Sequence, residues 1–343
     1  MKNHANIPVF IPHLGCPNQC VFCNQRTITG KSRFEIDSVI KTIEDALLTI
    51  PTEVETEIAF FGGSFTGIDR NLMIELLEIA YKYVKDGRVS SIRCSTRPDY
   101  IDQEILDILK KYGVKIIELG LQSVDEAVLL TSKRGHSFSD EQNAARLIID
   151  NGFTLVGQMM IGLPGSTIES ELATARFICE TGANAARVYP TVVFRETELC
   201  DMACDGRYIP LSVDEAVRRS AEVIRMFDSY GVKVIRVGLC ASENLSDFNT
   251  YYAGPNHSAL GELVENEIFY SIICEKIKEL GLPSGASVAV EVPRGSLSKA
   301  IGQNKKNKLR LICEFSLSRV DFYESADLTG HFVKCEERKN KCI

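Results

Sequence analysis

Three cysteines within one short segment carry the clearest chemical signal in the sequence. Cys16, Cys20 and Cys23 occur in the string CPNQCVFC, directly after an apolar stretch, residues 7–11, that we expect to form the first strand. A loop of this length can turn three thiolates toward one centre. Closed structural zinc sites usually have four protein ligands, and iron–sulfur clusters usually have four cysteines. Three cysteines with no obvious fourth nearby therefore indicate a cluster with one open iron.

A glycine-rich turn follows the second expected strand. Gly62, Gly63 and Ser64 come directly after residues 57–61. Glycine lets backbone N–H and C=O groups approach a ligand that a side chain would block. A glycine pair is weak support by itself because turns use glycine routinely. Its place one strand after the cysteine loop favours a ligand site.

The elements that must position these loops alternate between strand and helix. Helical spacing, with apolar residues every three or four positions, occurs in residues 168–178 and 213–227. Short apolar, β-branched runs predict strands at residues 7–11, 57–61, 90–94, 115–121, 154–161, 185–189 and 233–237. Repeated strand–helix units predict an α/β fold with a parallel sheet, in which ligands bind at the carboxyl ends of the strands.

Composition restricts the class of protein. The chain has 343 residues, a net charge of -7 and a hydrophobic content of 45%, which is typical of an ordinary soluble protein. No apolar run reaches the length of a membrane helix, and the first residues lack a secretory signal. We therefore expect a cytoplasmic protein whose 12 cysteines are mostly reduced thiols.

The cysteine and glycine loops together resemble the radical S-adenosylmethionine (SAM) superfamily, over roughly residues 6–240. The resemblance implies a partial parallel (β/α)6 barrel with a 4Fe–4S cluster held by Cys16, Cys20 and Cys23. SAM would chelate the open iron, and one electron from the cluster would break the sulfonium bond to give a 5′-deoxyadenosyl radical. The appendage after the barrel is expected to be a small α/β unit.

The same resemblance assigns residues to the cofactor. Phe22 matches the family's aromatic residue beside the last cysteine, and Gly62, Gly63 and Ser64 match the loop that holds the methionine amino group. Ser95 corresponds to a residue near the ribose. Gln122 and Arg134 correspond to residues near the methionine carboxylate. A guanidinium suits a carboxylate because it donates two parallel hydrogen bonds. Alternatively, Arg97 and Arg134 are ordinary ion-paired arginines, and Gln122 is satisfied by backbone.

Longer strings resemble the radical domain of the Elongator catalytic subunit. They are STRPDY at residues 95–100, ELGLQS at 118–123, KRGH at 133–136, MMIGLPGST at 159–167 and YPT at 189–191. That subunit spaces its cysteines more widely, has an acidic residue where Ser95 stands and carries an acetyltransferase domain. We expect the resemblance without that domain, because too few residues follow residue 240.

A basic tail follows residue 284, where Lys and Arg outnumber Asp and Glu. Its LSKAIG string followed by Asn307 resembles the core of KH RNA-binding domains, in which a glycine-rich turn clamps a single strand. Lys305, Lys306, Lys308 and Arg310 would then contact phosphates. The alternative is a small α/β appendage with a solvated basic loop. We expect a barrel at residues 1–240, a linker and helix at 241–283, and this domain at 284–343.

These features predict a radical SAM enzyme that modifies RNA, most plausibly tRNA, and takes electrons from a donor such as flavodoxin or ferredoxin, with no membrane or DNA partner. Two alternatives remain: a radical enzyme acting on a small molecule or protein, and a non-enzymatic iron–sulfur RNA-binding protein. Tyr189 and Cys240 are candidates to give hydrogen to a substrate radical, although buried residues of these types are more often structural. Cys200 and Cys204, one helical turn apart, could ligate a second metal.

Overall fold

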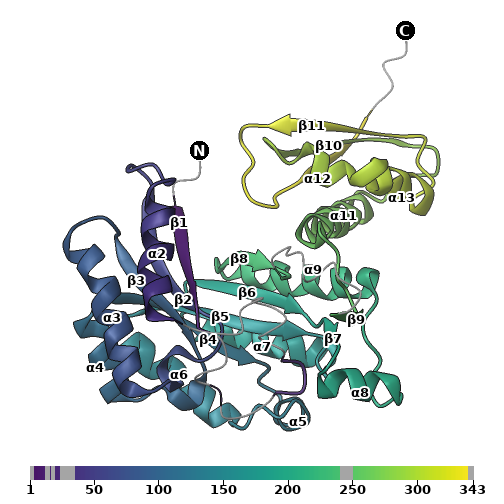
Figure 1. Cartoon of the computed structure of the whole chain (residues 1–343). Helices are drawn as coiled ribbons and strands as arrows, with labels where there is room; N and C mark the ends of the chain where they lie inside the picture. The colour runs from purple at the N-terminus through teal and green to yellow at the C-terminus, as the bar shows by residue number, and fades with distance from the viewer. Residues whose placement is uncertain (1–3, 12–15, 17–19, 24–34, 240–249, 339–343) are drawn as a thin grey trace. The chain divides into compact units, whose positions relative to one another are not determined.

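A curved sheet of seven parallel strands forms the core of the larger part of the chain (Figure 1). The computed structural model describes residues 4–11, 16, 20–23, 35–239 and 250–338. The sheet order is β1-β2-β3-β4-β5-β6-β8, and each neighbouring pair is parallel. The strands are β1 (His4–Phe10), β2 (Glu55–Phe61), β3 (Ser91–Thr96), β4 (Val114–Gln122), β5 (Thr154–Ile161), β6 (Ala185–Pro190) and β8 (Lys233–Val237). The predicted partial barrel is confirmed, with seven strands in its sheet where the (β/α)6 pattern has six.

Helices connect the successive strands of the sheet (Figure 1). They are α2 (Ile36–Leu47), α3 (Arg70–Lys85), α4 (Gln103–Lys111), α5 (Glu126–Thr131), α6 (Phe138–Asp150), α7 (Ile168–Glu180), α8 (Glu198–Cys204) and α9 (Val213–Ser229). Two 3-10 turns, η1 (Phe65–Gly67) and η2 (Pro98–Tyr100), follow β2 and β3, and a short antiparallel pair, β7 (Val193–Phe194) and β9 (Tyr251–Ala253), lies apart from the main sheet.

Side-chain caps begin many of these helices. Asp69 accepts hydrogen bonds from two backbone N–H groups at the start of α3, and Asp102 caps α4 in the same way. Ser137 and Thr167 form capping boxes at the starts of α6 and α7. Such caps satisfy N–H groups that have no partner within the helix, and each contributes about 1 kcal/mol.

The two faces of the sheet differ in chemistry. On one face, Ile58, Phe60 and Ile92 are completely buried, and the Phe60 and Phe65 rings stack with centroids 4.4 Å apart. Because side chains alternate along a strand, the intervening residues point to the opposite, inner face. These include Glu57 and Arg93, so the inner face is polar although it is also buried.

The chain divides into two compact units, Met1–Ser212 with Met226–Asn256, and Val213–Arg225 with His257–Ile343. The second unit contains α11 (Leu260–Leu280), β10 (Ser287–Pro293), α12 (Leu297–Ile301), η3 (Gln303–Lys305), α13 (Lys306–Glu314), β11 (Arg319–Ser325) and β12 (Lys334–Glu337). Helix α11, which the sequence places in the segment 241–283, shares a core with the tail: Phe269 and Ile273 pack in one cluster with Val288 and Val290.

The sheet of the second unit has the order β11-β10-β12. Strands β10 and β11 are parallel, and β12 is antiparallel to β10. Parallel neighbours need a crossover connection, which α12 and α13 supply. Of the basic residues singled out above, Lys305 lies in the turn between these two helices, and Lys306, Lys308 and Arg310 lie in α13. Across both units, no helix in the described residues is long and apolar enough to cross a membrane.

Candidate functional site

The cysteine loop lies at the carboxyl end of β1, where the parallel sheet places ligand sites. The Cys20 side chain is buried, and those of Cys16 and Cys23 are partly exposed. Backbone hydrogen bonds fix this loop from two sides: the Val21 N–H donates to the Ser132 carbonyl at 3.2 Å, and the Leu199 N–H donates to the Val21 carbonyl at 2.8 Å. The turn after α5 and the start of α8 thus hold the loop in place.

Two buried arginines face the sulfur of Cys20. Arg134 Nη1 donates to Cys20 Sγ at 3.3 Å, and Arg97 Nη1 donates to it at 3.7 Å. The two arginines also contact each other, because Arg97 Nη2 donates to the Arg134 carbonyl. Positive charge therefore lies beside the thiol that is buried most deeply, which suits a negatively charged ligand or thiolate.

The three thiols do not surround a single ion. Among the described residues, no group of three or more His, Cys, Asp and Glu side chains is arranged to hold one metal ion. A 4Fe–4S cluster takes one thiolate per iron, so its thiolates need not converge on one point. Burial raises the pKa of the Cys16 thiol, while a hydrogen bond from the Ser64 backbone and the nearby Arg97 act in the opposite direction.

The glycine turn after β2 packs directly against the strand that leads to the cysteine loop. Gly62 has a φ of 96°, and a Cβ atom there would lie 3.2 Å from the backbone nitrogen of Ile11. Gly63 has a φ of 147°. The Ser64 hydroxyl is buried and bonded within the protein, to Thr96 Oγ1 at 2.9 Å and to the Arg97 N–H at 3.2 Å. At Ser64, therefore, only the backbone is available to a ligand in this arrangement.

The end of β4 presents a second set of groups. A register irregularity between Gly120 and Gln122 accompanies a φ of 73° at Gln122, which is uncommon for a residue with a side chain. Arg134 Nη2 donates to the Gly120 carbonyl at 2.6 Å. Gln122 Oε1 and Arg134 Nε are both buried and have no hydrogen-bond partner among the described residues.

These unpartnered atoms fit the expected cofactor. A buried polar atom without a partner is costly, and it marks a place where a ligand can supply the missing bond. Arg134 Nε offers a donor for a carboxylate, and Gln122 Oε1 offers an acceptor for an amine. Together with three thiols and a glycine turn at the same edge of the sheet, they form a donor set that suits a cluster and SAM.

Ser95 and Tyr189 lie on the polar inner face of the half-barrel. The Ser95 hydroxyl is 3.5 Å from Glu118 Oε2 and accepts from Gln158 Nε2 at 3.3 Å. The Tyr189 hydroxyl accepts from Arg187 Nη1 at 3.4 Å, and burial raises the pKa of this phenol. Both residues thus belong to one network that the sequence analysis did not predict.

That network is a buried chain of charges across the strands. Arg93 lies 2.5 Å from Glu57 Oε2 and 2.9 Å from Glu118 Oε1. Arg187 lies 2.9 Å from Glu118 Oε2. The sequence contained a signal for this network. Glu57, Arg93, Glu118 and Arg187 are charged residues within four of the predicted strands. Charges inside strands that must be buried are expected to pair with one another.

The side chain of Phe22 packs against α8 and its neighbours. It contacts the cluster formed by Val21, Val193, Leu199, Cys200, Met202 and Tyr208. Cys204 is exposed, Cys200 is buried, and burial raises the pKa of the Cys200 thiol. No third ligand joins these two cysteines among the described residues, so a second metal there has no support. Cys240 lies outside the described residues.

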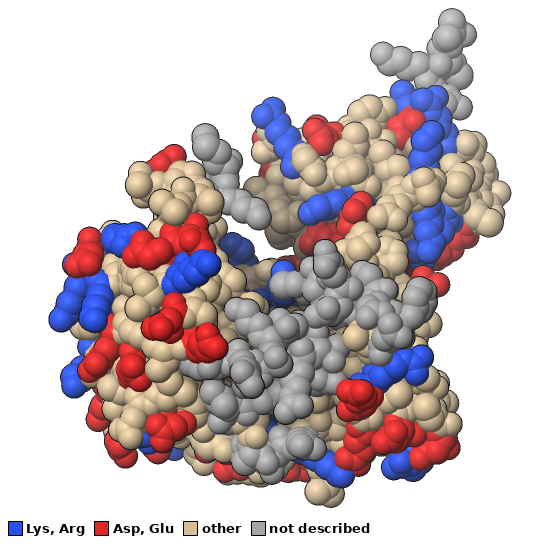
Figure 2. Space-filling model, viewed as in Figure 1, with Lys and Arg blue, Asp and Glu red and all other residues tan. Residues whose placement is uncertain are grey.

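The basic candidates in the second unit have different surroundings. Lys305 and Lys306 are exposed, and Lys308 is partly exposed. Arg310 is bound within the unit: its guanidinium lies 2.6 Å from Glu267 Oε2 and 3.5 Å above the Tyr270 ring. Figure 2 shows basic side chains on the surface of this unit together with acidic ones.

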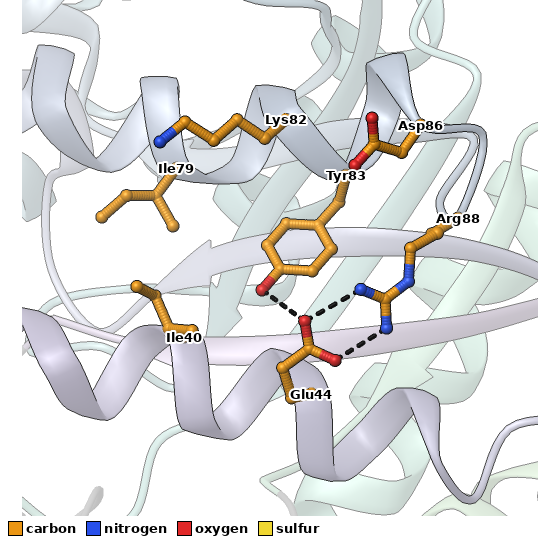
Figure 3. Close-up of a pocket in the computed structure, with 7 residues that line it drawn as sticks. All are labelled: Ile40, Glu44, Ile79, Lys82, Tyr83, Asp86 and Arg88. Carbon is orange, nitrogen blue, oxygen red and sulfur yellow. Dashed lines mark hydrogen bonds and ion pairs between the residues drawn. The ribbon is translucent and has the colours of Figure 1, made fainter.

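A separate surface pocket lies between α2 and α3 (Figure 3). Three of its polar groups bind one another, since Glu44 accepts two hydrogen bonds from Arg88, at 2.8 and 2.7 Å, and one from Tyr83 at 2.9 Å. These bonds hold the pKa of Glu44 at about 2. Two of its lining residues, Asp86 and Arg88, precede β3, so the pocket lies at the amino edge of the sheet. The cysteine loop lies at the opposite, carboxyl edge.

The half-barrel with three loop cysteines and a buried arginine pair defines a class of iron–sulfur enzyme that uses SAM. The sequence model of the Radical SAM superfamily matches residues 10–178, and that of the Radical_SAM C-terminal domain matches residues 183–269. The chain belongs to the radical SAM superfamily and is a radical SAM enzyme, with a 4Fe–4S cluster and SAM as its cofactors. Neither match extends over the basic turn, so the KH-like tail stays a prediction.

Part of the chain is similar to relatives with named activities. The chain is 31% identical to a tRNA uridine(34) acetyltransferase of Methanocaldococcus infernus over 52% of this chain and 33% of that protein. It is 31% identical to human Elongator complex protein 3 over 46% of this chain and 30% of that protein. The chain thus spans about a third of their length. A solved structure of Methanocaldococcus infernus Elp3 with an N-terminal deletion has the same fold, with a TM-score of 0.62 and 21% identity over 82% of this chain and 64% of that chain.

Proposed function

We propose that this radical SAM enzyme modifies tRNA. The radical chemistry in this proposal is supported by the site around Cys20, where two buried arginines donate to the Cys20 sulfur, and by the buried, unpartnered oxygen of Gln122. The substrate class is supported by relatives named as a tRNA uridine(34) acetyltransferase and as Elongator complex protein 3. In this proposal the enzyme works in the cytoplasm and takes electrons from a flavodoxin or ferredoxin.

The residues divide between the two cofactors. Cys16, Cys20 and Cys23 hold the cluster. The groups assigned to SAM are Phe22, the backbone of Gly62, Gly63 and Ser64, and the side chains of Ser95, Gln122 and Arg134. When bound, the cluster and SAM would together supply a 5′-deoxyadenosyl radical that abstracts hydrogen from the substrate.

In this proposal the Arg134 guanidinium orients the methionine carboxylate. Gln122, which the resemblance places near the same carboxylate, offers its unpartnered amide oxygen to the adjacent amino group. Tyr189 and Cys240 are the candidates to return hydrogen to the substrate. Tyr189 already lies in the buried network that lines the inner face.

Three lysines at the turn after α12 and in the first turn of α13 are proposed to contact RNA phosphates. Lys305 and Lys306 are exposed there, with Asn304 and Lys305 both in the left-handed backbone region. Lys306 Nζ lies 3.8 Å from Asp214 Oδ1, a pair between exposed groups that a phosphate can replace at little cost. Arg310 must leave both Glu267 and Tyr270 to bind RNA, so we assign phosphate contacts to Lys305, Lys306 and Lys308.

Production of 5′-deoxyadenosine tests the radical chemistry. The anaerobically reconstituted protein is reduced with dithionite in the presence of SAM, and 5′-deoxyadenosine is measured by chromatography. We expect product from the wild type and none from Cys23→Ala. The matched control is Cys313→Ala, which removes an exposed thiol of α13 and should leave product formation unchanged. Absence of product from wild-type protein with a full cluster would contradict the proposal.

Binding of unmodified tRNA tests the substrate class. Lys305, Lys306 and Lys308 are changed together to Gln, and the dissociation constant is measured at several salt concentrations. Each lost phosphate contact should lower the slope of log affinity against log salt by about 0.7. The control changes Lys110, Lys111 and Lys115, three exposed lysines around the end of α4, to Gln. Equal effects of both triple changes, or no tRNA binding by the wild type, would favour a small-molecule or protein substrate.

A further inference from the structure

The sulfur of Cys20 lies against two arginine side chains. Two guanidinium groups donate to its sulfur, from Arg134 at 3.3 Å and from Arg97 at 3.7 Å. Hydrogen bonds to cluster sulfurs and nearby charge are among the factors that set the reduction potential of an iron–sulfur cluster. The two arginines are therefore placed to affect how readily the cluster takes up an electron.

Arg97 is held in position by a row of side chains that begins with Asp99, which is partly accessible, and continues to the buried His136 and Glu141. Its Nε and Nη2 donate to the two oxygens of Asp99, at 2.9 and 3.0 Å. Asp99 Oδ1 lies 3.7 Å from Nδ1 of the completely buried His136 ring. On its other side, His136 Nε2 is 3.1 Å from Glu141 Oε1. The bonds to Asp99 fix the orientation of the Arg97 guanidinium. Its remaining nitrogen, Nη1, then points at Cys20 Sγ.

We propose that Arg97 and Arg134 stabilise the reduced cluster by donating hydrogen bonds to the Cys20 sulfur, and that Asp99 and His136 are positioning residues for Arg97. Uptake of one electron adds negative charge to the cluster, and donors aimed at a ligand sulfur favour that state. This inference rests on the cluster being held by Cys16, Cys20 and Cys23. It is independent of the proposed tRNA substrate.

The two arginines differ in their net effect. Arg97 forms a bidentate ion pair with Asp99, which offsets its charge. Arg134 donates to a neutral carbonyl, Gly120, and to the sulfur. We therefore expect the loss of Arg134 to have the larger effect on the reduction equilibrium.

Redox titration without SAM tests the proposal. The midpoint potential of the reconstituted cluster is measured by electron paramagnetic resonance for the wild type, Arg97→Gln and Arg134→Gln. We expect each change to lower the reduction equilibrium constant by at least tenfold, which is about 59 mV for a one-electron couple. Midpoint potentials equal to that of the wild type, at full iron content, would overturn it.

Arg88→Gln is the matched control. It is the same substitution at an arginine that forms a bidentate pair with a carboxylate, here Glu44 at the surface (Figure 3). Arg88 precedes β3 and Arg97 follows it, so the two are separated by on the order of 20 Å of strand. Its potential should match the wild type, and a shift as large as that of Arg97→Gln would contradict a local effect.

Two further variants separate position from charge and from folding. Asp99→Asn keeps both arginines and releases Arg97; the potential should fall if Asp99 positions Arg97 and should rise if Asp99 only offsets its charge. If Arg97→Gln does not fold because Asp99 is left unpaired, the double change Arg97→Gln with Asp99→Asn removes both charges of the pair, and its potential should also fall. SAM affinity is measured alongside: it should drop for Arg134→Gln and persist for Arg97→Gln. Because no RNA is present, a failure of the tRNA proposal does not change these outcomes.

Discussion

Arg93 and Glu118 form an ion pair of 2.9 Å between neighbouring strands β3 and β4, and their side chains are only 7% and 1% exposed. Glu118 also accepts from Arg187 and from Gln158, both at 2.9 Å. The interior of a parallel barrel is usually filled by branched apolar side chains. The inner face of this half-barrel is instead built from paired charges, and Ser95 and Tyr189 lie within them.

Glu118 is expected to stabilise the fold strongly, because its removal leaves two buried arginines without a shared partner. We expect Glu118→Ala to lower the free energy of unfolding by about 3–5 kcal/mol. Urea titration followed by circular dichroism measures this change. The control is Glu104→Ala, which breaks an exposed pair with Arg70 and should cost at most about 1 kcal/mol. Similar costs for the two variants would show that the inner network contributes little.

Glu141 should make stability fall as pH rises toward neutrality. Burial raises the pKa of this carboxyl to about 7, although His136 and Arg134 favour its charged form and Glu126 opposes it. Between pH 4.5 and 7 the unfolded chain releases this proton while the native state keeps it, so the native state binds more protons and loses stability with rising pH. A shift of this size corresponds to about 3 kcal/mol.

The measurement compares wild type and Glu141→Gln by urea unfolding at several pH values in that range. Glutamine keeps the hydrogen bond to His136 and cannot ionise, so its stability should be less dependent on pH. An identical slope in both proteins would show that Glu141 does not titrate with the expected pKa.

The sheet was predictable because its strands read as short apolar, β-branched runs between helical segments. Residues 154–161 and 233–237 were predicted with the same bounds that β5 and β8 have. The carboxyl-edge position of Cys20 and Gln122 followed from the parallel topology. The hydrogen bonds from Arg97 and Arg134 to Cys20 were not predictable, because they join residues 77 and 114 positions apart through side-chain geometry.

In the second unit, residue type and spacing did not predict which side chains contact one another. The sequence analysis correctly expected a small α/β unit after the barrel, but its assignment of Arg310 to RNA considered only the charge of that residue. Its engagement with Glu267 and Tyr270 depends on how α11 packs against α13, which residue type and spacing do not report. Helix α11 has apolar residues around much of its surface, so its pattern did not indicate which elements it would contact.

Changing Gly62 to alanine should destabilise the protein more than the same change at Gly87. Both glycines have a positive φ, but the Cβ position at Gly87 is in open space. An alanine Cβ at residue 62 would lie 3.2 and 3.3 Å from the Ile11 backbone, while at Gly87, with a φ of 70°, nothing lies within 4 Å. Both changes incur conformational strain of about 1–2 kcal/mol, but only Gly62→Ala also displaces the strand that leads to the cysteine loop. We expect a lower melting temperature and lower iron incorporation for Gly62→Ala than for Gly87→Ala. Equal values would contradict a packing role for the glycine turn.

Gly302 is expected to fix the shape of the basic turn through its contact with Asn307. It has a φ of 78°, and a Cβ there would lie 3.0 Å from both the backbone nitrogen and the Cγ of Asn307. The Asn307 side chain is buried and donates to the carbonyls of Asn266 and Ala300, at 2.7 and 3.2 Å, so it cannot move aside without losing these bonds.

Gly302→Ala should therefore lower the melting temperature of the full chain by more than Gly295→Ala, which has a φ of 76° and nothing within 4 Å of its Cβ position. If the turn also binds RNA, Gly302→Ala should weaken tRNA binding by altering the path of the backbone while all three lysines remain. Differential scanning calorimetry and a tRNA titration on the same two proteins measure both effects. Indistinguishable unfolding of the two variants would show that the Gly302–Asn307 contact does not determine the conformation of the turn.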